Sequence, residues 1–515
     1  MPPKKVVPTL QTLSQESVLF RVCEIILSEI YFSDDDRWSQ WTDEPPELSV
    51  MLKLVCEYLS ENLSPCILEN LLNDILKKEE AVEPTVRLIA IQMLLVNGVR
   101  NLVTGNFPST YYSLVLQSIA KCGEGLTKLD LRGVWIHNFD NKFHLLRSLR
   151  KLVNIKHLTL RYNVDDEILN ALGKYCSRLE MLDICGSKNI SEEGLINLCK
   201  NPNRVAVGQL SETLKILKIG GPAALKMPPE LIAVILKHIP NITSLGPYEH
   251  TGRAIEQVLK ETPDKKFGLR YMHDTLTSMQ KYVSIKKSCP NLQSVYFDGP
   301  KSEVLEQLGL SKNLSEIKLN RIKWDDLKAM LENIGKQLRS LFLLTVWGQI
   351  DLVKLGSLCP NLYRLEMHRV ELICDDDHHE TAFNNLIELY IYSTKISTYC
   401  IKLLLNQCIN IEHLTLGQCG YLTDLSVINS LKEHSLLNVR EIWFGIATEL
   451  TMETIQALME HCPNLKSLGN VGHWNVYPDD LDFLRVQLFL NNCDLKLHEF
   501  SPQGDAEEVI IAMPQ

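Results

Sequence analysis

Apolar residues recur along this chain in the spacing Leu-x-x-Leu-x-Leu or a close variant. Some copies open with the phrase Cys-Pro-Asn-Leu, at Cys289, Cys359 and Cys462. Most copies follow one another after about 22 to 29 residues. Their first apolar positions are Leu126, Ile155, Leu179, Leu214, Ile242, Leu292, Leu314, Leu338, Leu362, Leu386, Ile411, Val439 and Leu465. A period of this length indicates an array of one repeated structural unit.

Each repeat predicts a strand followed by a helix. Leu365 and Met367 are two residues apart, so they point to the same face of a strand. After the next strand the apolar residues are three and four apart, as a helix requires, at Ile396, Cys400, Leu403 and Leu404. One such coil cannot bury its apolar side alone, so neighbouring coils must stack. The expected fold class is therefore α/β, a leucine-rich-repeat solenoid with parallel strands on its concave face and helices on its convex face.

The spacing divides the chain into segments. Residues 1–8 are polar and are expected to be disordered, and residues 9–120 show a helical apolar period without the leucine spacing. Residues 9–120 are therefore predicted to form a helical head, with helices starting near Pro65 and after Pro84. The array is assigned to residues 121–493, and residues 494–515 to a C-terminal tail.

One part of the array does not follow the pattern. About twice the usual interval separates Ile242 from Leu292. We expect residues 247–288 to form an irregular segment with a loop at Pro263 and a degenerate repeat at Leu269–Met272.

Charge and cysteine usage limit the classes of partner. The net charge of -10 argues against a nucleic-acid binder, which usually carries a clustered basic surface. The start of the chain lacks the apolar core of a secretory signal, and no run approaches the roughly 18 apolar residues of a membrane span. We expect a protein of the cytoplasm or the nucleus, without a nucleic acid or a membrane as partner. Six cysteines at corresponding points of the repeats are expected to pack between coils, at Cys122, Cys176, Cys289, Cys359, Cys408 and Cys462.

No catalytic or cofactor-binding motif is present in the sequence, including phosphate-binding loops, nucleophile elbows and HExxH. The prediction is a non-enzymatic protein with no cofactor and no metal. The segment from Cys374 to Glu380 contains carboxylates and imidazoles and is interpreted as a solvated acidic loop. A cation site in this loop is left open as the alternative.

Side chains on the concave face are not packed in the core, so they can bind a partner. The residues between the last two apolar positions of successive repeats include Lys218, Lys318, Thr415 and several aromatic residues. A few large aromatic anchors on a rigid surface are typical of protein recognition. The alternative is a set of scattered aromatic residues that are partly covered by their neighbours. The candidate protein-binding residues are Tyr296, Phe342, Tyr363, Glu366, His368, Tyr390, Tyr392 and Trp443.

The repeats resemble the cysteine-containing leucine-rich repeats of ubiquitin-ligase substrate receptors, and the head looks most like that of the Zyg/Zer group. Members of that group open with Ser/Thr-Leu-x-x-x-Cys-x-x-x-aliphatic, a VHL box that joins Elongin C and cullin-2. This chain has Thr9, Leu10 and Val18 at the matching positions, with Ser14 in place of the cysteine. The stretch Pro65-x-x-Leu68-x-x-Leu71 resembles the cullin-binding element of the group. The adaptor-binding candidates that the resemblance implies are Thr9, Leu10, Ser14, Val18, Pro65, Leu68 and Leu71.

Two other interpretations of the head remain open. Residues 63–76 also resemble the start of an F-box, which would imply a Skp-type adaptor and cullin-1. A head that only caps the first repeat needs no adaptor at all. The resemblance implies the substrate-recognition subunit of a cullin-RING ubiquitin ligase, which binds protein substrates on the concave face. The alternative is a leucine-rich-repeat interaction scaffold without a link to a ligase.

Overall fold

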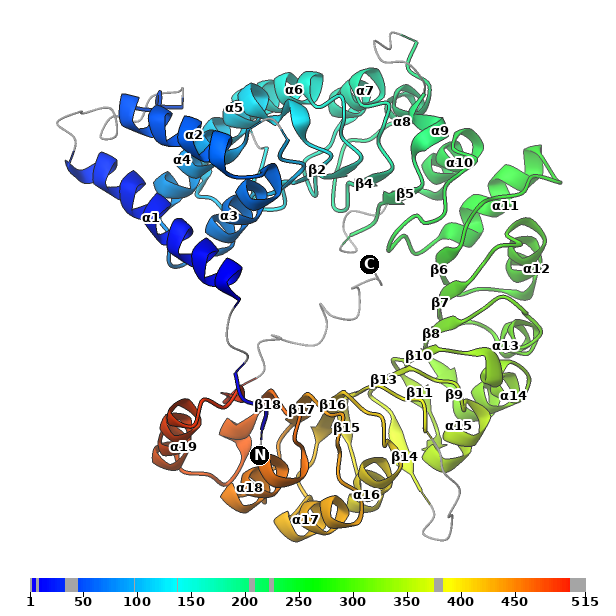
Figure 1. Cartoon of the computed structure of the whole chain (residues 1–515). Helices are drawn as coiled ribbons and strands as arrows, with labels where there is room; N and C mark the ends of the chain where they lie inside the picture. The colour runs from blue at the N-terminus through cyan, green and yellow to red at the C-terminus, as the bar shows by residue number, and fades with distance from the viewer. Residues whose placement is uncertain are drawn as a thin grey trace. The chain divides into compact units, whose positions relative to one another are not determined.

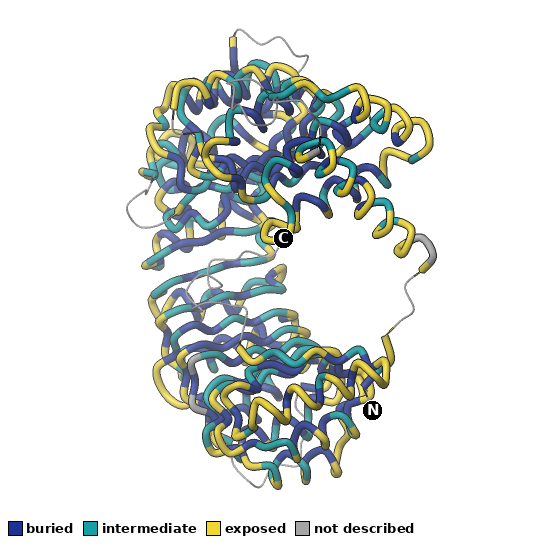
Figure 2. The backbone as a smooth tube through the Cα atoms, turned by 90° about the vertical axis from the view of Figure 1, so that its left-hand side faces the viewer, coloured by how far each residue is buried: buried dark blue, intermediate teal, exposed yellow. Residues whose placement is uncertain are grey.

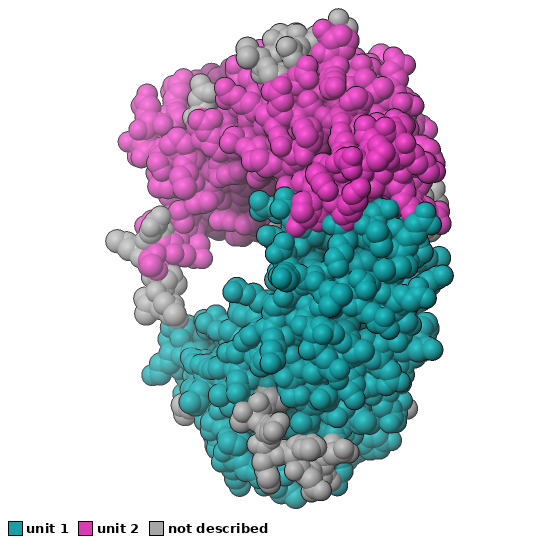
Figure 3. Space-filling view, turned by 90° about the vertical axis from the view of Figure 1, so that its right-hand side faces the viewer, with its two compact units in different colours: residues 1–7, 270–286, 291–515 teal, residues 8–269, 287–290 magenta. Residues whose placement is uncertain are grey.

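The computed structural model describes residues 2–5, 9–32, 45–96, 98–136, 138–202, 209–221, 227–374 and 383–500. The chain divides into two compact units (Figure 3). We call residues 8–269 and 287–290 the N-terminal unit, and residues 1–7, 270–286 and 291–515 the C-terminal unit.

The N-terminal unit begins with four helices: α1 (Leu10–Phe32), α2 (Val50–Asn62), α3 (Pro65–Lys77) and α4 (Pro84–Leu94). Pro65 and Pro84 stand at the first position of their helices, where the missing N–H costs no intrahelical hydrogen bond. Ser49 caps α2 by accepting a hydrogen bond from the backbone N–H of Leu52 at 3.2 Å. The head therefore starts its helices at residues whose chemistry suits a helix N-terminus.

Five parallel strands and their helices follow in the same unit. The strands pair in chain order and are β1 (Asn101–Val103), β2 (Lys128–Asp130), β3 (His157–Thr159), β4 (Met181–Asp183) and β5 (Ile216–Lys218). The helices are α5 (Tyr112–Cys122), α6 (Phe139–Lys151), α7 (Asp166–Tyr175), α8 (Glu192–Cys199), α9 (Leu210–Thr213), α10 (Pro229–His238) and α11 (Thr251–Glu261).

The C-terminal unit contains a parallel sheet of ten strands. In chain order these are β6 (Tyr271–Thr275), β7 (Ser294–Asp298), β8 (Glu316–Asn320), β10 (Ser340–Leu343), β13 (Arg364–His368), β15 (Glu388–Lys395), β16 (His413–Gln418), β17 (Glu441–Phe444), β18 (Ser467–Gly469) and β19 (Lys496–His498). Two small sheets pair β9 (Ile322–Lys323) with β11 (Val346–Trp347) and β12 (Gln349–Asp351) with β14 (Glu371–Ile373).

Helices cover the outer side of the ten-stranded sheet (Figure 1). They are α12 (Met279–Ser288), α13 (Ser302–Leu308), α14 (Trp324–Ile334), α15 (Leu352–Leu358), α16 (Thr398–Gln407), α17 (Asp424–Glu433), α18 (Met452–His461) and α19 (Pro478–Leu490). Each strand runs parallel to the next and is followed by a helix or turn on the other face, which is the leucine-rich-repeat arrangement. The predicted fold class is confirmed.

The leucines that define the repeat stack on one another. Leu365, Leu389 and Leu414 are aligned across β13, β15 and β16, and each is at most 2% exposed. The buried residues follow the strands of each unit (Figure 2). Transfer of these side chains out of water is the main stabilising contribution, about 2 kcal/mol for each fully buried leucine. Leu292 departs from the pattern, because its side chain is only half-buried.

The cysteines of the repeats take part in this packing. The described cysteines are free thiols, and Cys176, Cys289, Cys359, Cys408 and Cys462 are buried, whereas Cys122 is half-buried. Burial raises the pKa of Cys176 and of Cys408 to about 12. These thiols are therefore small apolar core groups.

The array extends further at both ends than the leucine spacing indicates. Strand β1 pairs with β2, so it belongs to the array and not to the head. The leucine spacing did not reveal this strand, because Thr104 stands at the last leucine position of the pattern. Thr104 is fully buried, and its hydroxyl donates to the carbonyl of Asp130 at 3.1 Å. At the other end, β19 pairs with β18 beyond the predicted boundary at residue 493.

Two other segment assignments also differ from the structure. Residues 247–288 contain α11, β6 and α12, and β6 pairs along its full length with β7, so the segment as a whole is a regular part of the array. A turn lies at Pro263, where a loop was predicted. Leu269 and Met272 are 0% and 1% exposed at the place where the degenerate repeat was predicted, and β6 begins between them. At the N-terminus, the backbone of Lys4 forms an antiparallel β-bridge with the backbone of Cys493. The backbone N–H of Lys5 donates a hydrogen bond to the carbonyl of Asn492 at 2.8 Å. Residues 2–5 are thus ordered against the last repeat.

None of the described helices combines the length and the apolar character that crossing a membrane requires.

Candidate functional site

One row of side chains runs across the strand face of the C-terminal unit. The strand register aligns the residue between the last two apolar positions of each repeat, and we call this set the central row. Its members are His273, Tyr296, Lys318, Phe342, Glu366, Tyr390, Thr415, Trp443, Gly469 and His498. Side chains in a row of this kind are held by the sheet and not by a mobile loop.

Cationic groups lie between the aromatic rings of the central row. The Lys318 ammonium is 5.0 Å from the ring centre of Tyr296 and 5.7 Å from that of Phe342. The Arg364 guanidinium is 5.1 Å from both the Phe342 ring and the Tyr390 ring. Contacts of this length are attractive cation–π interactions of about 0.5–2 kcal/mol each. They hold the three rings in a fixed arrangement.

Glu366, a member of the central row, interacts with His368 two residues later on the same strand. The Glu366 carboxylate accepts a hydrogen bond from Arg364 at 3.0 Å and lies 2.9 Å from Nε2 of His368. Burial alone would raise the pKa of Glu366, but the hydrogen bonds from His368 and Arg364 together lower it. Glu366 is 4% exposed and His368 is 2% exposed. The prediction that these two residues contact a partner is therefore corrected, because their neighbours already cover them.

The tyrosines next to this pair are half-buried. The rings of Tyr390 and Tyr392 are parallel, with centres 6.1 Å apart, and the Tyr392 ring stacks on His368 at 4.8 Å. Burial raises the pKa of Tyr390 to about 12. Both phenols are thus neutral and still partly accessible.

Residues of β18 and β19 fix the position of the Trp443 ring. A Cβ added at Gly469 would lie 1.8 Å from the Trp443 ring, so the indole lies flat over this glycine. The indole also stacks on His498, with ring centres 5.3 Å apart. Tyr363, which precedes β13, is 47% exposed. Of the eight predicted residues, Tyr296, Phe342, Tyr390, Tyr392 and Trp443 share the half-buried strand face, and binding by them stays a prediction.

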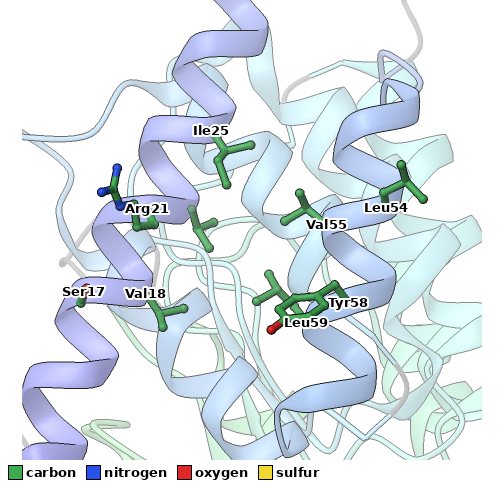
Figure 4. Close-up of a pocket in the computed structure, with 9 residues that line it drawn as sticks. Ser17, Val18, Arg21, Ile25, Leu54, Val55, Tyr58 and Leu59 are labelled. Atoms are coloured by element: carbon green, nitrogen blue, oxygen red, sulfur yellow. The ribbon is translucent and has the colours of Figure 1, made fainter.

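An apolar groove lies on the head of the N-terminal unit (Figure 4). It has a volume of about 340 Å³ and runs between α1 and α2. Its lining is apolar except for Ser17, Arg21 and the Tyr58 hydroxyl, with Val18, Val22, Ile25, Leu54, Val55 and Leu59 as the other residues. Leu54 is 57% exposed and Tyr58 is 66% exposed. Exposed apolar groups that line a groove between two helices are typical of a site for another protein.

The adaptor-binding candidates are only partly available to a partner. Thr9 accepts a hydrogen bond from the backbone N–H of Thr12 at 3.1 Å, and Ser14 is exposed on α1. Val18 lines the groove, whereas the side chain of Leu10 lies outside the described residues. Pro65 is exposed, but Leu68 and Leu71 are each 1% exposed. The two leucines belong to the core of the head, which corrects the expectation that they contact a cullin.

Sequence reasoning missed Arg364 and, on the α2 side of the groove, the exposed side chain of Tyr58 next to Leu54. Arg364 lies two residues before Glu366 of the central row. Its guanidinium contacts the rings of Phe342 and Tyr390 on the two neighbouring strands, and the spacing within its own repeat does not predict these contacts. Leu54 and Tyr58 carry a detectable signal, since they are four residues apart on a predicted helix and are not both needed for its buried face. A second exposed pair, Trp135 stacked on Tyr162 at 5.8 Å, was also missed.

In the part of the chain that the structure describes, there is no group of three or more His, Cys, Asp or Glu side chains placed to hold a metal ion. Residues 375–380, where a cation site was left open, lie outside the described residues.

Comparison with known proteins gives weak similarities. No family model matches the chain. F-box/LRR-repeat protein 4 of Bos taurus is 26% identical over 115 residues, which are 22% of this chain and 18% of that protein. The match thus spans less than a fifth of the relative's length.

Two solved structures are also similar to this chain. Yeast Rad7, from its complex with Elc1, is 15% identical with a TM-score of 0.37, and the match covers 92% of this chain and 95% of that chain. TLR13, from its complex with ssRNA13, is 13% identical with a TM-score of 0.40, over 78% of this chain and 58% of that chain. Identities and TM-scores this low do not assign the fold, which is assigned here from the strand register described above.

Proposed function

We propose that this chain is a non-enzymatic substrate-recognition subunit of a cullin-RING ubiquitin ligase. The strand face of the C-terminal unit would hold the protein substrate, and the head would join the ligase through an adaptor. The similarity to an F-box/LRR-repeat protein supports this assignment over a repeat protein of another class. Such a subunit would act in the cytoplasm or the nucleus.

The observation that carries the proposal is the fixed arrangement of rings in the central row. Tyr296, Phe342 and Tyr390 are held by the cations between them, and Trp443 is held by Gly469 and His498. A partner that binds such rings loses little side-chain entropy on the receptor side, so the buried ring area contributes to affinity. This is the property that a rigid protein-binding surface needs.

The groove between α1 and α2 is the proposed adaptor site. It is a gap between two helices that an amphipathic helix of a partner can fill with apolar side chains. Val18 is the one adaptor candidate that lines it. Elongin C with cullin-2 is the first choice of partner, and a Skp-type adaptor with cullin-1 is the second.

Affinity purification of the full chain from cells tests the adaptor. Recovery of Elongin C and cullin-2, or of the Skp-type adaptor and cullin-1, supports the ligase assignment. Tyr58→Glu, which places a carboxylate in the groove, should abolish that recovery. Ser60→Glu adds the same charge at an exposed position of α2 outside the groove and should leave it unchanged. Recovery of neither adaptor by the unmodified chain would favour the plain interaction scaffold.

A further inference from the structure

The central row contains three intervals in which two aromatic residues flank one intervening strand. Tyr296 and Phe342 flank β8, Phe342 and Tyr390 flank β13, and Tyr390 and Trp443 flank β16. Neighbouring strands are about 4.8 Å apart, so the flanking residues start about 9.6 Å apart in each interval. The intervals are therefore comparable sites within one sheet.

The chain itself fills the first two intervals with a cation. Lys318 of β8 lies between Tyr296 and Phe342, and Arg364 of β13 lies between Phe342 and Tyr390. Lys318 occupies the central row, whereas Arg364 reaches the rings from two residues before it. In both cases a long basic side chain contacts a ring on each side.

Carboxylates accompany each of these cations. Burial lowers the pKa of Lys318, and the charges of Glu366 and Glu316 oppose that shift. Arg364 pairs with Glu366 at 3.0 Å and with Glu388 at 3.3 Å. Each filled interval thus combines two rings, one cation and two carboxylates.

The third interval has the rings and the carboxylates without a long basic side chain. Strand β16 contributes Thr415 in the central row and His413 two residues earlier. The side chain of Thr415 is short and uncharged, and its hydroxyl opposes the rise in the pKa of Tyr392 that burial causes. The flanking strands supply Glu388 and Glu441, and both raise the pKa of Tyr390, after burial as the largest cause.

These groups remain accessible from outside. Tyr390, Thr415 and Trp443 are each half-buried, and the Glu441 side chain is 46% exposed. The contact of Glu441 is with Nδ1 of His413, at 3.2 Å. Glu388 is 22% exposed and already pairs with Arg364, so Glu441 is the more accessible of the two carboxylates to a group that approaches from solvent.

We propose that the third interval, between Tyr390 and Trp443 above Thr415, receives an arginine or lysine side chain of the bound protein. The incoming cation would repeat the contacts that Lys318 and Arg364 make inside the chain. Its charge complements Glu388 and Glu441, and its methylene groups cover the rings. This assignment rests on the proposed binding of a protein to the strand face, and it adds the chemical class of the recognised side chain.

A random dodecapeptide library displayed on phage is the probe, panned against the immobilised full chain. Clones are kept when Tyr390→Ala abolishes their binding. The kept clones should share an arginine or lysine, and replacing that residue with glutamine in the synthetic peptide should weaken binding about tenfold. Glu441→Gln in the protein should weaken the basic peptide to a similar degree and change the glutamine peptide little. Glu460→Gln, on the exposed side of α18, is the matched control and should change neither.

The outcomes separate this inference from the proposed function. Clones that depend on Tyr390 but lack a shared basic residue, or basic peptides with equal affinity for Glu441→Gln and the unmodified chain, overturn the cation site alone. Panning that yields no clone dependent on Tyr390 overturns both.

A second variant tests the same site by supplying the cation from within the chain. Thr415→Lys puts an ammonium at the register position of Lys318, so Tm should be unchanged or higher and the basic peptide should no longer bind. A fall in Tm together with retained peptide binding would contradict the assignment.

Discussion

The indole of Trp443 lies directly over Gly469, where an added Cβ would be 1.8 Å from the ring. Because the ring also stacks on His498, the glycine, the indole and the imidazole connect β17, β18 and β19 on the strand face. One missing side chain thus determines where a large aromatic side chain of the proposed binding surface can lie.

Gly469→Ala should displace the Trp443 ring. The added methyl group forces the indole to another rotamer and removes its stacking on His498, so the free energy of unfolding should fall by about 1–3 kcal/mol. Near-ultraviolet circular dichroism and urea unfolding measure the two effects. Gly420→Ala is the control, since the nearest atom to its added Cβ is 3.8 Å away. An unchanged near-ultraviolet spectrum for Gly469→Ala would contradict the placement of the ring.

The buried ion pair at the start of the ten-stranded sheet should be sensitive to loss of one partner. Lys281 Nζ is 2.9 Å from Asp274, and their side chains are 9% and 0% exposed. Lys281→Met leaves a buried carboxylate without its counter-charge and should reduce the free energy of unfolding by about 3–5 kcal/mol. The exposed pair of Lys287 and Asp264 is the comparison. Lys287→Met should change the free energy of unfolding by less than about 1 kcal/mol. Equal effects of the two variants in urea unfolding would argue against this difference in burial.

The thiols should differ sharply in reactivity. Cys66 is exposed, whereas burial raises the pKa of Cys176 and Cys408 to about 12. The thiolate is the reactive form, so maleimide should label Cys66 in the native protein and spare the two buried thiols even at pH 9. Peptide mapping by mass spectrometry identifies the labelled sites, with Cys66→Ser as the control. Native labelling of Cys408 would show that this part of the core is open.

Glu180 should make stability depend on pH in the acid range. Hydrogen bonds from Lys215 and Lys156, at 2.9 and 3.0 Å, lower the pKa of Glu180 to about 2. Because the folded-state pKa lies below the unfolded value of about 4.3, the carboxylate stabilises the fold above that pH. This contribution is lost as the pH falls from about 4.3 towards 2.

Thermal unfolding between these two pH values measures the effect. Glu180→Gln should show a weaker decline of Tm with falling pH than the unmodified chain. Glu332→Gln, exposed on α14, should follow the unmodified chain. Parallel curves for all three proteins would contradict the assigned pKa.

The repeat architecture could be predicted because it depends on local spacing. Leu365, Leu389 and Leu414 each occupy the same place in their own repeat, and stacking such repeats leaves one arrangement that buries all three. The first strand was missed because Thr104 replaces an apolar residue, and its hydroxyl is satisfied only by the carbonyl of Asp130 in the next repeat. A hydrogen bond between repeats cannot be predicted from the spacing of the apolar residues.

The candidate site could be predicted only in part. The register places Tyr390 and Trp443 on the strand face from the sequence alone. The burial of Glu366 and His368 follows from the lengths and orientations of neighbouring side chains, which spacing does not contain. The groove has the same origin, since the pattern predicts the apolar faces of α1 and α2 but not the gap between them.

Comparative capture of proteins from cell extract tests the central claim, that the strand face of the C-terminal unit holds a protein. The full chain is compared with the triple variant Tyr390→Ala, Tyr392→Ala and Trp443→Ala, and with a control that carries Tyr399→Ala and Phe483→Ala on the helices. We predict that the triple variant keeps its Tm within a few degrees and its adaptor, but loses specific proteins that the control retains. Identical sets of captured proteins from the triple variant and the unmodified chain would contradict the claim.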